Sequence, residues 1–375
     1  MAFSFDFTGD DIAASPPHAS SSPPPPPTPS ACAFPIPGRP QLPPTRHDLT
    51  ALAARLPSRI CYSQLDIALD ATNGSTPPLL RLPRRELWDV RVQVMAEDGD
   101  DDDALGPLDV KTGIYEGGFK SWESSVDLVK VLQQTAPLEL LDQAVRIIEL
   151  GCGTALPSLA LFLTALLRPS AQASIDFILA DYNPSVLELV TLPNLLLVWA
   201  LNQHSHPHPD AIVSAALTTP GELQLSPPLL NAFHAQLAHS NITLSFLSGA
   251  WSPAFVDLVY AHSLPVRPSF ATFVLGSETI YSPAALNAFT ETILDLLHRE
   301  QTYAASGAQA LVSAKRLYFG VGGSLDDFIR KARHLGAQVS WLRQETQGIR
   351  RGVVRCIIPT SSANGVSHSS KHNNT

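Results

Sequence analysis

Short apolar runs alternate with segments of helical periodicity along most of the chain after residue 110. The apolar runs predict strands at 145–150, 174–183, 241–251, 269–281, 308–320 and 352–359. Amphipathic or uniformly apolar segments between them predict helices at 122–135, 155–167, 184–201, 283–303 and 324–336. Strands that alternate with helices indicate an α/β fold with a parallel, doubly wound, Rossmann-like sheet. We place this domain at 111–359 and expect the polar tail, 360–375, to be disordered.

The segment before this domain has two parts. Residues 1–45 are mostly rich in Pro and Ser, and we expect them to be disordered because they bury too little apolar surface to offset the entropy of ordering. A polyproline ligand for an SH3-type partner is the alternative to a plain linker. In the extension 46–110, apolar and polar positions alternate from Trp88 to Val94, which predicts a strand. The acidic run 97–103 then predicts a solvated loop or, alternatively, a dock for a basic target.

Two stretches inside the domain, 202–240 and 260–268, are long for α/β connections. The first begins with His204, His206 and His208, but no carboxylate or thiol arrangement completes a metal site there. A polar loop broken by prolines is the simpler interpretation, and we predict no metal.

The composition of the chain mainly excludes some classes of protein. The formal net charge of −9 argues against direct nucleic-acid binding, which requires a basic face, but not against a basic protein partner. The four cysteines are scattered without a CxxC pair, as expected of free thiols in a reducing compartment. The N-terminus shows no secretory signal, and the runs 155–167 and 192–201 are shorter than the roughly 18 residues of a membrane helix. We therefore expect a soluble monomer that resides in the cytoplasm, the nucleus or both.

The candidate cofactor loop is "RIIELGCGTALPSL" (146–159), which reads as a strand, a glycine turn and the start of a helix. Gly151 and Gly153 let the backbone turn tightly and approach a ligand without a Cβ in the way. The third glycine of a dinucleotide fingerprint is absent. Glu149, just before the turn, would repel a pyrophosphate but attract the ammonium and sulfonium of S-adenosylmethionine. Asp181, at the end of the next strand, is suited to accept hydrogen bonds from ribose hydroxyls. The pattern favours S-adenosylmethionine as the cofactor, with NAD as the alternative.

Further motifs follow in a fixed order: "GIYEGGFKSWESSVDLV" (113–129), "DYNPSVLELVTLPN" (181–194), "SGAW" (248–251), "SETIY" (277–281) and "AKRLYFGVGG" (314–323). Together with the glycine loop they resemble the protein-histidine N-methyltransferase family of the histidine protein methyltransferase 1 (methyltransferase-like 18) type. These are class I S-adenosylmethionine-dependent methyltransferases with a seven-strand sheet. The resemblance covers 111–359 well and the N-terminal region only in short patches, such as "FSFDFTGDDI" (3–12).

The resemblance implies which residues of this chain contact the cofactor. It implies a pocket made by Ser121, Trp122, Glu123, Ser124, Gly151, Gly153, Asp181, Tyr182, Asn183, Gly249, Trp251 and Ser277. Two positions depart from the family pattern, because Ser124 stands where the family often has Cys and Ala250 where an acid is common. The family methylates the tele nitrogen of one histidine in a large-subunit ribosomal protein, L-three, so the resemblance implies this basic protein as the substrate.

Imidazole is a suitable nucleophile for such a transfer. Its unperturbed pKa of about 6.5 leaves it mostly neutral at cytosolic pH, whereas lysine, at about 10.4, must first lose a proton. A histidine-directed enzyme therefore needs only an acceptor that holds Nδ1–H and presents the Nε2 lone pair. Glu278 is our candidate for this acceptor and Tyr281 for a residue that orients the ring. The alternative is that both side chains only brace their strand.

The stretch "TGIYEGGFKSWE" (112–123) combines glycines with aromatic residues ahead of the cofactor loop. Its glycines predict a bend across the carboxyl edge of the sheet, where α/β folds bind ligands. Trp122 is expected to wall the cofactor, and Tyr115 and Phe119 are candidates to receive an imidazole. Phe119 and Trp122 also fit core positions of the helix that follows, so the role of Phe119 stays open.

Two other functions remain possible at this point. A lysine methyltransferase of the seven-strand group would use the same cofactor residues. A non-catalytic scaffold could hold a basic ribosomal protein beside a retained pocket. The joint presence of Glu149, Gly151, Gly153 and Asp181 argues against a decayed pocket and for an enzyme.

Overall fold

The computed structural model describes most of the chain. The described residues are 40–71, 76–97, 118–135, 143–168, 173–261, 271–303, 307–318 and 322–359. The predictions for the N-terminal residues up to 39, for Tyr115, for the acidic run after residue 97 and for the tail 360–375 lie outside these residues.

The centre of the fold is an eight-stranded sheet of order β1-β7-β5-β4-β8-β9-β11-β10. Its strands are β1 (Thr45–His47), β4 (Val145–Leu150), β5 (Ile175–Asp181), β7 (Ile242–Ser248), β8 (Ala271–Ser277), β9 (Ala308–Lys315), β10 (Gln338–Glu345) and β11 (Arg351–Ile357). The central strands β7, β5, β4, β8 and β9 pair in parallel, and antiparallel pairs involving β1, β11 and β10 complete both edges. The predicted parallel Rossmann-like sheet is thus confirmed, whereas β1 and β10 were not predicted.

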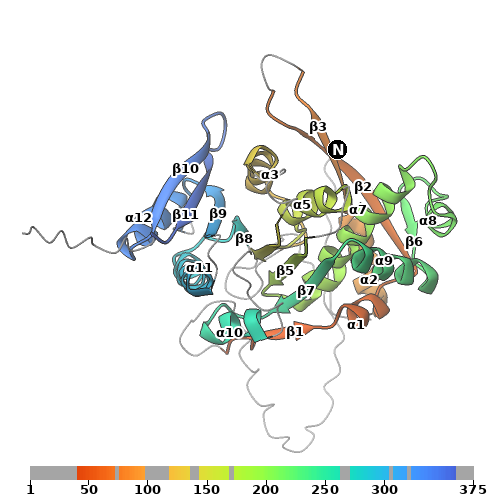
Figure 1. Ribbon diagram of the computed structural model, residues 1–375, viewed down its shortest axis with the longest axis horizontal. Coiled ribbons are helices and arrows are strands. Elements are labelled where there is room, and N and C mark those ends of the chain that lie inside the picture. The colour runs from red at the N-terminus through yellow and green to blue at the C-terminus, as the bar shows by residue number, and fades with distance from the viewer. Residues whose placement is uncertain are drawn as a thin grey trace, which may run out of the picture.

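Helices cover both faces of this sheet (Figure 1). They are α3 (Glu123–Thr135), α5 (Leu156–Leu166), α7 (Leu192–His204), α10 (Pro253–Ala261), α11 (Pro283–Tyr303) and α12 (Leu325–His334). Side chains of α3, α5 and α7 form one core with the sheet, and side chains of α10, α11 and α12 form a second core. The central strands are buried on both faces, which is why they appear in the sequence as continuous apolar runs.

The predicted helix after β5 is longer than expected and irregular. It begins with α6 (Pro184–Val186), continues through a π-helical turn, η1 (Leu187–Thr191), and ends with α7. By length and composition the stretch Pro184–His204 could cross a membrane, but 83% of its most apolar window is buried inside the protein. This helix therefore belongs to the core, as the sequence predicted.

Residues before the main domain and within 202–240 build a second, three-stranded sheet of order β3-β2-β6. The strands of this sheet are β2 (Arg59–Ala68), β3 (Leu79–Arg85) and β6 (Glu222–Gln224). The same two regions also contain the helices α1 (Leu49–Ala54), α8 (Ala211–Ala216) and α9 (Pro227–His239). The connection 202–240 is therefore largely folded, and only its first, histidine-rich turn matches the expected polar loop. The side chains of Asp210 and Ser226 accept hydrogen bonds from backbone N–H groups in the first turns of α8 and α9.

The predicted strand between Trp88 and Val94 is wrong, because these residues belong to the helix α2 (Leu87–Glu97). Leu87, Val90 and Val94 pack with side chains of η1, which is the i, i+3, i+7 spacing of one helical face. Trp88 and Val92 are 55% and 59% exposed. The alternation of apolar residues is thus typical of a strand, but packing of one helical face against η1 determines the helix found here.

Candidate active site

A cavity opens at the carboxyl ends of the central parallel strands, where open α/β sheets bind ligands. It encloses about 750 Å³, including its open mouth. Its lining consists of Gly118, Lys120, Ser121, Trp122, Ser125, Gly151, Cys152, Gly153, Thr154, Leu156, Pro157, Asp181, Tyr182, Gly249, Trp251, Ser277, Glu278, Thr279 and Tyr281. These residues come from the segment that leads into α3 and the first turn of that helix, from the loop after β4 and the start of α5, and from the carboxyl ends of β5 and β8 and the turns after β5, β7 and β8.

The structure brings most of the predicted site residues together in this lining: Ser121, Trp122, Gly151, Gly153, Asp181, Tyr182, Gly249, Trp251, Ser277, Glu278 and Tyr281. Four predicted residues, Glu123, Ser124, Glu149 and Asn183, are not part of it. The sequence missed Gly118, Lys120, Ser125, Cys152, Thr154, Leu156, Pro157 and Thr279. Most of the missed residues directly neighbour a predicted one, so the motifs themselves were the available signal.

The glycine loop and the segment before α3 lie in direct contact. Gly151 and Gly153 both have the left-handed backbone that favours glycine, with φ of 64° and 51°. A Cβ on Gly153 would lie 2.9 Å from the carbonyl oxygen of Gly118. Glycine at position 153 therefore lets the segment that leads into α3 lie directly against the loop. Of the glycines for which the sequence predicted a bend, Gly113 and Gly117 lie outside the described residues, and Gly118 has a positive φ of 118°.

Asp181 holds the glycine loop and faces the cavity at the same time. One carboxylate oxygen accepts the backbone N–H of Gly153 at 3.0 Å, and the other accepts that of Asn183 at 3.1 Å. A carboxylate oxygen can accept more than one hydrogen bond, so these two contacts do not by themselves prevent hydrogen bonds from the hydroxyls of a ribose.

Glu149 lies behind the loop, 1% exposed. Its carboxylate accepts the backbone N–H of Ser158 at 3.0 Å and also the Ser158 hydroxyl. It thereby caps the first turn of α5, whose N-cap residue, Ala155, has no side chain that could do so. Burial raises the pKa of Glu149 to about 8. A carboxyl group with this pKa is mostly protonated near neutral pH, so it carries little of the negative charge on which its predicted attraction to the cations of a cofactor depends.

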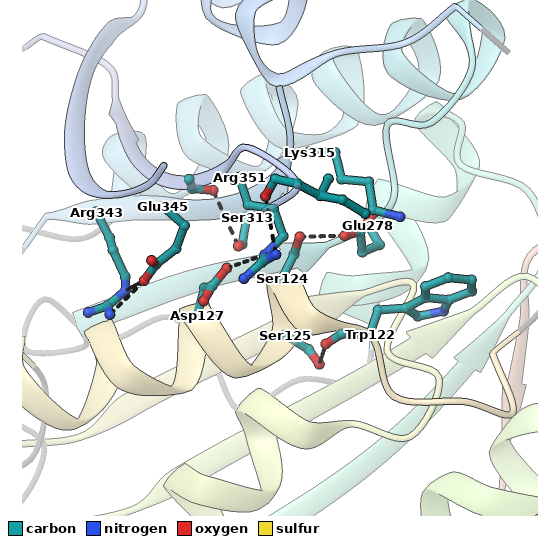
Figure 2. A network of polar contacts seen from close by, with 12 residues as sticks. Trp122, Ser124, Ser125, Asp127, Glu278, Ser313, Lys315, Arg343, Glu345 and Arg351 are labelled. Atoms are coloured by element: carbon teal, nitrogen blue, oxygen red, sulfur yellow. Dashed lines mark hydrogen bonds and ion pairs between the residues drawn. The ribbon is translucent and has the colours of Figure 1, made fainter. Parts of the chain in front are cut away.

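Glu278 directly follows β8 and has a left-handed backbone, with φ of 57°. Its N–H donates to the carbonyl of Ser313 on β9 at 3.0 Å. One carboxylate oxygen accepts the hydroxyl of Ser124 (Figure 2), and the other accepts the phenol of Tyr318 at 2.5 Å. Burial raises the pKa of this carboxyl group, while the two hydroxyls and the ammonium of Lys315 act in the opposite direction. A left-handed backbone at a non-glycine residue is uncommon and tends to occur at functional sites.

The aromatic residues near Glu278 have different positions. Trp122 is 38% exposed and lines the cavity, with the Lys315 ammonium 5.2 Å from the centre of its ring (Figure 2). Phe119 is 5% exposed and packs with residues of α2 and η1, so it belongs to the core. Tyr281 lines the cavity but packs beside Tyr182 and Ala250. A phenol that does donate to Glu278 is that of Tyr318, which lies in one of the predicted motifs but had no predicted role.

An ion pair fixes the helix that carries Ser124. Arg351 on β11 donates to the carboxylate of Asp127 on α3 at 2.7 Å (Figure 2), and the Asp127 side chain is 3% exposed. A buried, charge-assisted hydrogen bond of this kind gives the start of α3 one defined position. The Trp122 carbonyl also accepts the Ser125 hydroxyl at 2.6 Å, which holds the first turn of the helix.

The residues present fit a nucleoside cofactor. Asp181 offers acceptors for ribose hydroxyls, and glycine backbone forms the floor of the cavity. The hydroxyl of Thr279, in the lining, is buried and has no hydrogen-bond partner among the described residues. In the described part of the chain, no group of three or more His, Cys, Asp or Glu side chains is placed to hold a metal ion.

The eight-stranded sheet is Rossmann-like, a glycine loop follows β4, and an acid, Asp181, ends β5. Together these features define a class I methyltransferase. Such enzymes use S-adenosylmethionine, and the cavity at the carboxyl edge of the sheet is placed and lined to receive it.

Comparison with known proteins gives the family. Histidine protein methyltransferase 1 of Saccharomyces cerevisiae is 38% identical over 268 residues, which cover 67% of this chain and 69% of the yeast protein. The protein of the same name from Schizosaccharomyces pombe is 33% identical over 280 residues, covering 72% and 75%. The chain belongs to the histidine protein methyltransferase 1 family, and it is an S-adenosylmethionine-dependent methyltransferase. No protein-family model matches the chain.

Solved structures with a similar fold are more distant. A putative RNA methyltransferase from Pyrococcus horikoshii has a TM-score of 0.33 at 11% identity, covering 66% of this chain and 89% of its own. A glycopeptide N-methyltransferase complexed with sinefungin has a TM-score of 0.32 at 10% identity, covering 62% and 87%. At these TM-scores neither likeness bears on the activity.

Proposed function

We propose that the protein transfers a methyl group from S-adenosylmethionine to the tele nitrogen, Nε2, of a histidine in the large-subunit ribosomal protein L-three. The observation that carries this proposal is the Glu278 carboxylate, which is fixed by hydroxyl donors on both oxygens and lines the cavity. The names of the yeast relatives support a protein histidine as the acceptor of the methyl group.

The cofactor supplies a methyl group on a sulfonium, whose departure leaves a neutral thioether. Glu278 accepts Nδ1–H of the neutral target imidazole, which leaves the lone pair on Nε2 free for in-line attack. The new Nε2–CH₃ bond forms as the S–CH₃ bond breaks, and the ring becomes an imidazolium. The nearby carboxylate stabilises this positive charge, and the Nδ1 proton stays on the ring until the product leaves for solvent.

The same carboxylate disfavours a lysine target. An anionic group beside an amine stabilises its protonated form, which has no lone pair for the attack. The carboxylate also raises the pKa of an imidazole, but from about 6.5 rather than about 10.4, so a much larger neutral fraction stays available for attack at cytosolic pH. Glu278 therefore favours histidine over lysine as the methylated residue.

The acidic character of the chain is compatible with the proposed partner. A net charge of −9 attracts a basic ribosomal protein and gives no support to direct nucleic-acid binding. We propose that the enzyme acts as a monomer on this protein in the cytoplasm, the nucleus or both.

The test is transfer of labelled methyl from S-adenosylmethionine to purified L-three, with the wild-type substrate and its target His→Ala form. Label on the wild type that disappears with the mutant substrate is expected, and chromatography of the hydrolysate should give tele-methylhistidine. Glu278→Gln should lower kcat by about 100-fold with unchanged cofactor affinity. Label that persists on the mutant substrate would indicate lysine or another site. Cofactor binding without any label would favour the scaffold function.

A further inference from the structure

Glu278 is held from two separate elements of the fold. The Ser124 hydroxyl comes from the first turn of α3, and the Tyr318 phenol comes from the turn after β9. Ser124 is fully buried and Tyr318 is 9% exposed. Each donor takes a different oxygen of the carboxylate, so the carboxylate plane cannot rotate without losing one of the two hydrogen bonds.

The direction of the Tyr318 hydrogen bond follows from a second contact. The backbone N–H of Lys315 donates to the Tyr318 oxygen at 3.4 Å. A phenol that accepts one hydrogen bond has its own proton available for another acceptor, and the nearest one is the Glu278 oxygen at 2.5 Å. Burial and the negative charge of Glu278 raise the pKa of Tyr318 well above its usual value, so it remains a donor throughout the working pH range.

Charged groups near Glu278 act on its pKa in both directions. Lys315 lies on β9 with its ammonium 5.2 Å from the ring centre of Trp122 and 5.7 Å from that of Tyr318. Its positive charge lowers the pKa of Glu278, whereas Glu123 on α3 raises it. Asp127 and Arg351, further along α3 and on β11, are paired with each other. Lys315 and the two hydroxyls therefore stabilise the ionised form of Glu278 and reduce the increase in its pKa that burial causes.

We propose that Tyr318 and Ser124 are positioning residues that fix the Glu278 carboxylate in one orientation and thereby decide which nitrogen of the target imidazole receives the methyl group. This inference rests on the proposed function. A carboxylate fixed at both oxygens offers its remaining lone pairs in one direction, so the target ring can donate Nδ1–H only with Nε2 towards the methyl group. A carboxylate free to rotate also accepts the flipped ring, in which Nδ1 would be methylated.

The test compares Tyr318→Phe, Ser124→Ala and Ser124→Cys with the wild type in the histidine methylation assay. We expect Tyr318→Phe and Ser124→Ala each to lower kcat by about 10-fold, which corresponds to the loss of one charge-assisted hydrogen bond. KM for the target protein should change less than kcat, and the share of pros-methylhistidine in the product should rise. Ser124→Cys keeps a weak donor and should fall between Ser124→Ala and the wild type.

The pH profile gives a readout that a purely structural role would not move. Each hydroxyl lowers the pKa of Glu278, so its removal raises that pKa. The acid limb of kcat should therefore shift to higher pH in both Tyr318→Phe and Ser124→Ala, while the titration of the target histidine is the same in all variants.

Tyr260→Phe is the matched control. Tyr260 also donates from a phenol to a buried carboxylate, Glu300 at 2.9 Å, but Glu300 contacts Arg146 and Thr272 at the amino ends of the strands. Its removal should leave kcat, the pH profile and the product ratio unchanged.

Cofactor binding measured by calorimetry shows whether each variant is folded. If Tyr318→Phe does not bind the cofactor, the rates, pH profiles and product ratios of Ser124→Ala and Ser124→Cys test the inference. Wild-type rate, pH profile and product ratio in the Tyr318 and Ser124 variants would overturn the inference, as would equal changes in Tyr260→Phe. A wild-type enzyme that labels no histidine would instead overturn the proposed function.

Discussion

The side chain of Asn194 on α7 connects the N-terminal extension to the cofactor loop through Arg85. Its amide oxygen accepts the backbone N–H of Arg85 at 2.7 Å, and its amide nitrogen donates to the carbonyl of Thr154 at 3.0 Å. The Arg85 guanidinium in turn donates to the carbonyl of Leu189 in the π-helical turn at 2.9 Å and to Asp89 at 2.7 Å. The extension is therefore part of the structure that holds the loop.

Asn194→Ala should weaken both the fold and cofactor binding. It leaves the Thr154 carbonyl and the Arg85 N–H buried without their partner, at a cost of about 1–3 kcal/mol in the free energy of unfolding. Urea denaturation measures this change, and calorimetry with S-adenosylhomocysteine measures cofactor affinity. Asn287→Ala is the control, because Asn287 is exposed and its side chain accepts a hydrogen bond from the partly exposed Lys331. Unchanged cofactor affinity in Asn194→Ala would show that the loop is held without the extension.

Gly249 connects the cavity to the segment that precedes β1. It has φ of 102°, and a Cβ there would lie 2.3 Å from the carbonyl oxygen of Pro43. Gly249→Ala should therefore lower the free energy of unfolding by about 3 kcal/mol or more. Gly336 has a similar φ of 93°, but a Cβ added there would meet no atom within 4 Å, so Gly336→Ala should cost only about 1 kcal/mol. Equal losses in the two variants, measured by chemical denaturation, would show that backbone strain alone accounts for the effect.

Asp181→Ala should reduce cofactor affinity by about 100-fold, because it removes a ribose acceptor together with the charge-assisted hydrogen bond to Gly153. Calorimetric titration with S-adenosylhomocysteine checks this. Asp210→Ala removes a carboxylate that likewise accepts a backbone N–H, that of Ile212 at 2.7 Å, but at the exposed start of α8. It should leave the affinity unchanged, and wild-type affinity in Asp181→Ala would exclude the predicted ribose contact.

Glu149 should make the stability of the protein depend on pH. Burial raises its pKa from 4.5 to about 8, so between these values the folded protein retains a proton that the unfolded chain releases. The free energy of unfolding should therefore fall as pH rises through this range, by at most about 1.4 kcal/mol per pH unit from this group. Glu149→Gln keeps an acceptor oxygen for Ser158 and removes the titration, so its stability should depend less on pH.

Denaturation of wild type and Glu149→Gln at several pH values between 5 and 9, at about unit intervals, measures this dependence. Glu291→Gln is the control, because the Glu291 side chain is 65% exposed and pairs with Lys331 at the surface. Parallel stability curves for wild type and Glu149→Gln would show that Glu149 is already ionised in the folded protein.

Local features of the sequence were sufficient for the central strands of the sheet and for the centre of the site. The central strands β4, β5, β7, β8 and β9 are mostly buried and their sequences are predominantly apolar, so they could be recognised without knowing their neighbours. Gly151, Gly153 and Asp181 were recognisable because a tight turn and a carboxylate at a strand end are properties of a few adjacent residues.

Other parts could not be obtained in this way. The alternating residues from Trp88 to Val94 fit a strand as well as a helix, and packing against η1 selected the helix. Glu149 was predicted to contact the cofactor because it precedes the glycine turn, but in the fold its carboxyl group accepts hydrogen bonds from Ser158 at the start of α5. In both cases the deciding neighbour lies outside the local window that a sequence pattern describes.

The sequence by itself determined the class of fold and the glycine loop, and it singled out Glu278, an acid that lines the cavity, because each depends on periodicity or on a short motif. Only the tertiary structure decided how that acid is held. Its two donors, Ser124 and Tyr318, are 154 and 40 residues away along the chain, and no spacing rule connects them to it. They meet because α3 packs across β9 and β11, and that packing is a property of the whole core.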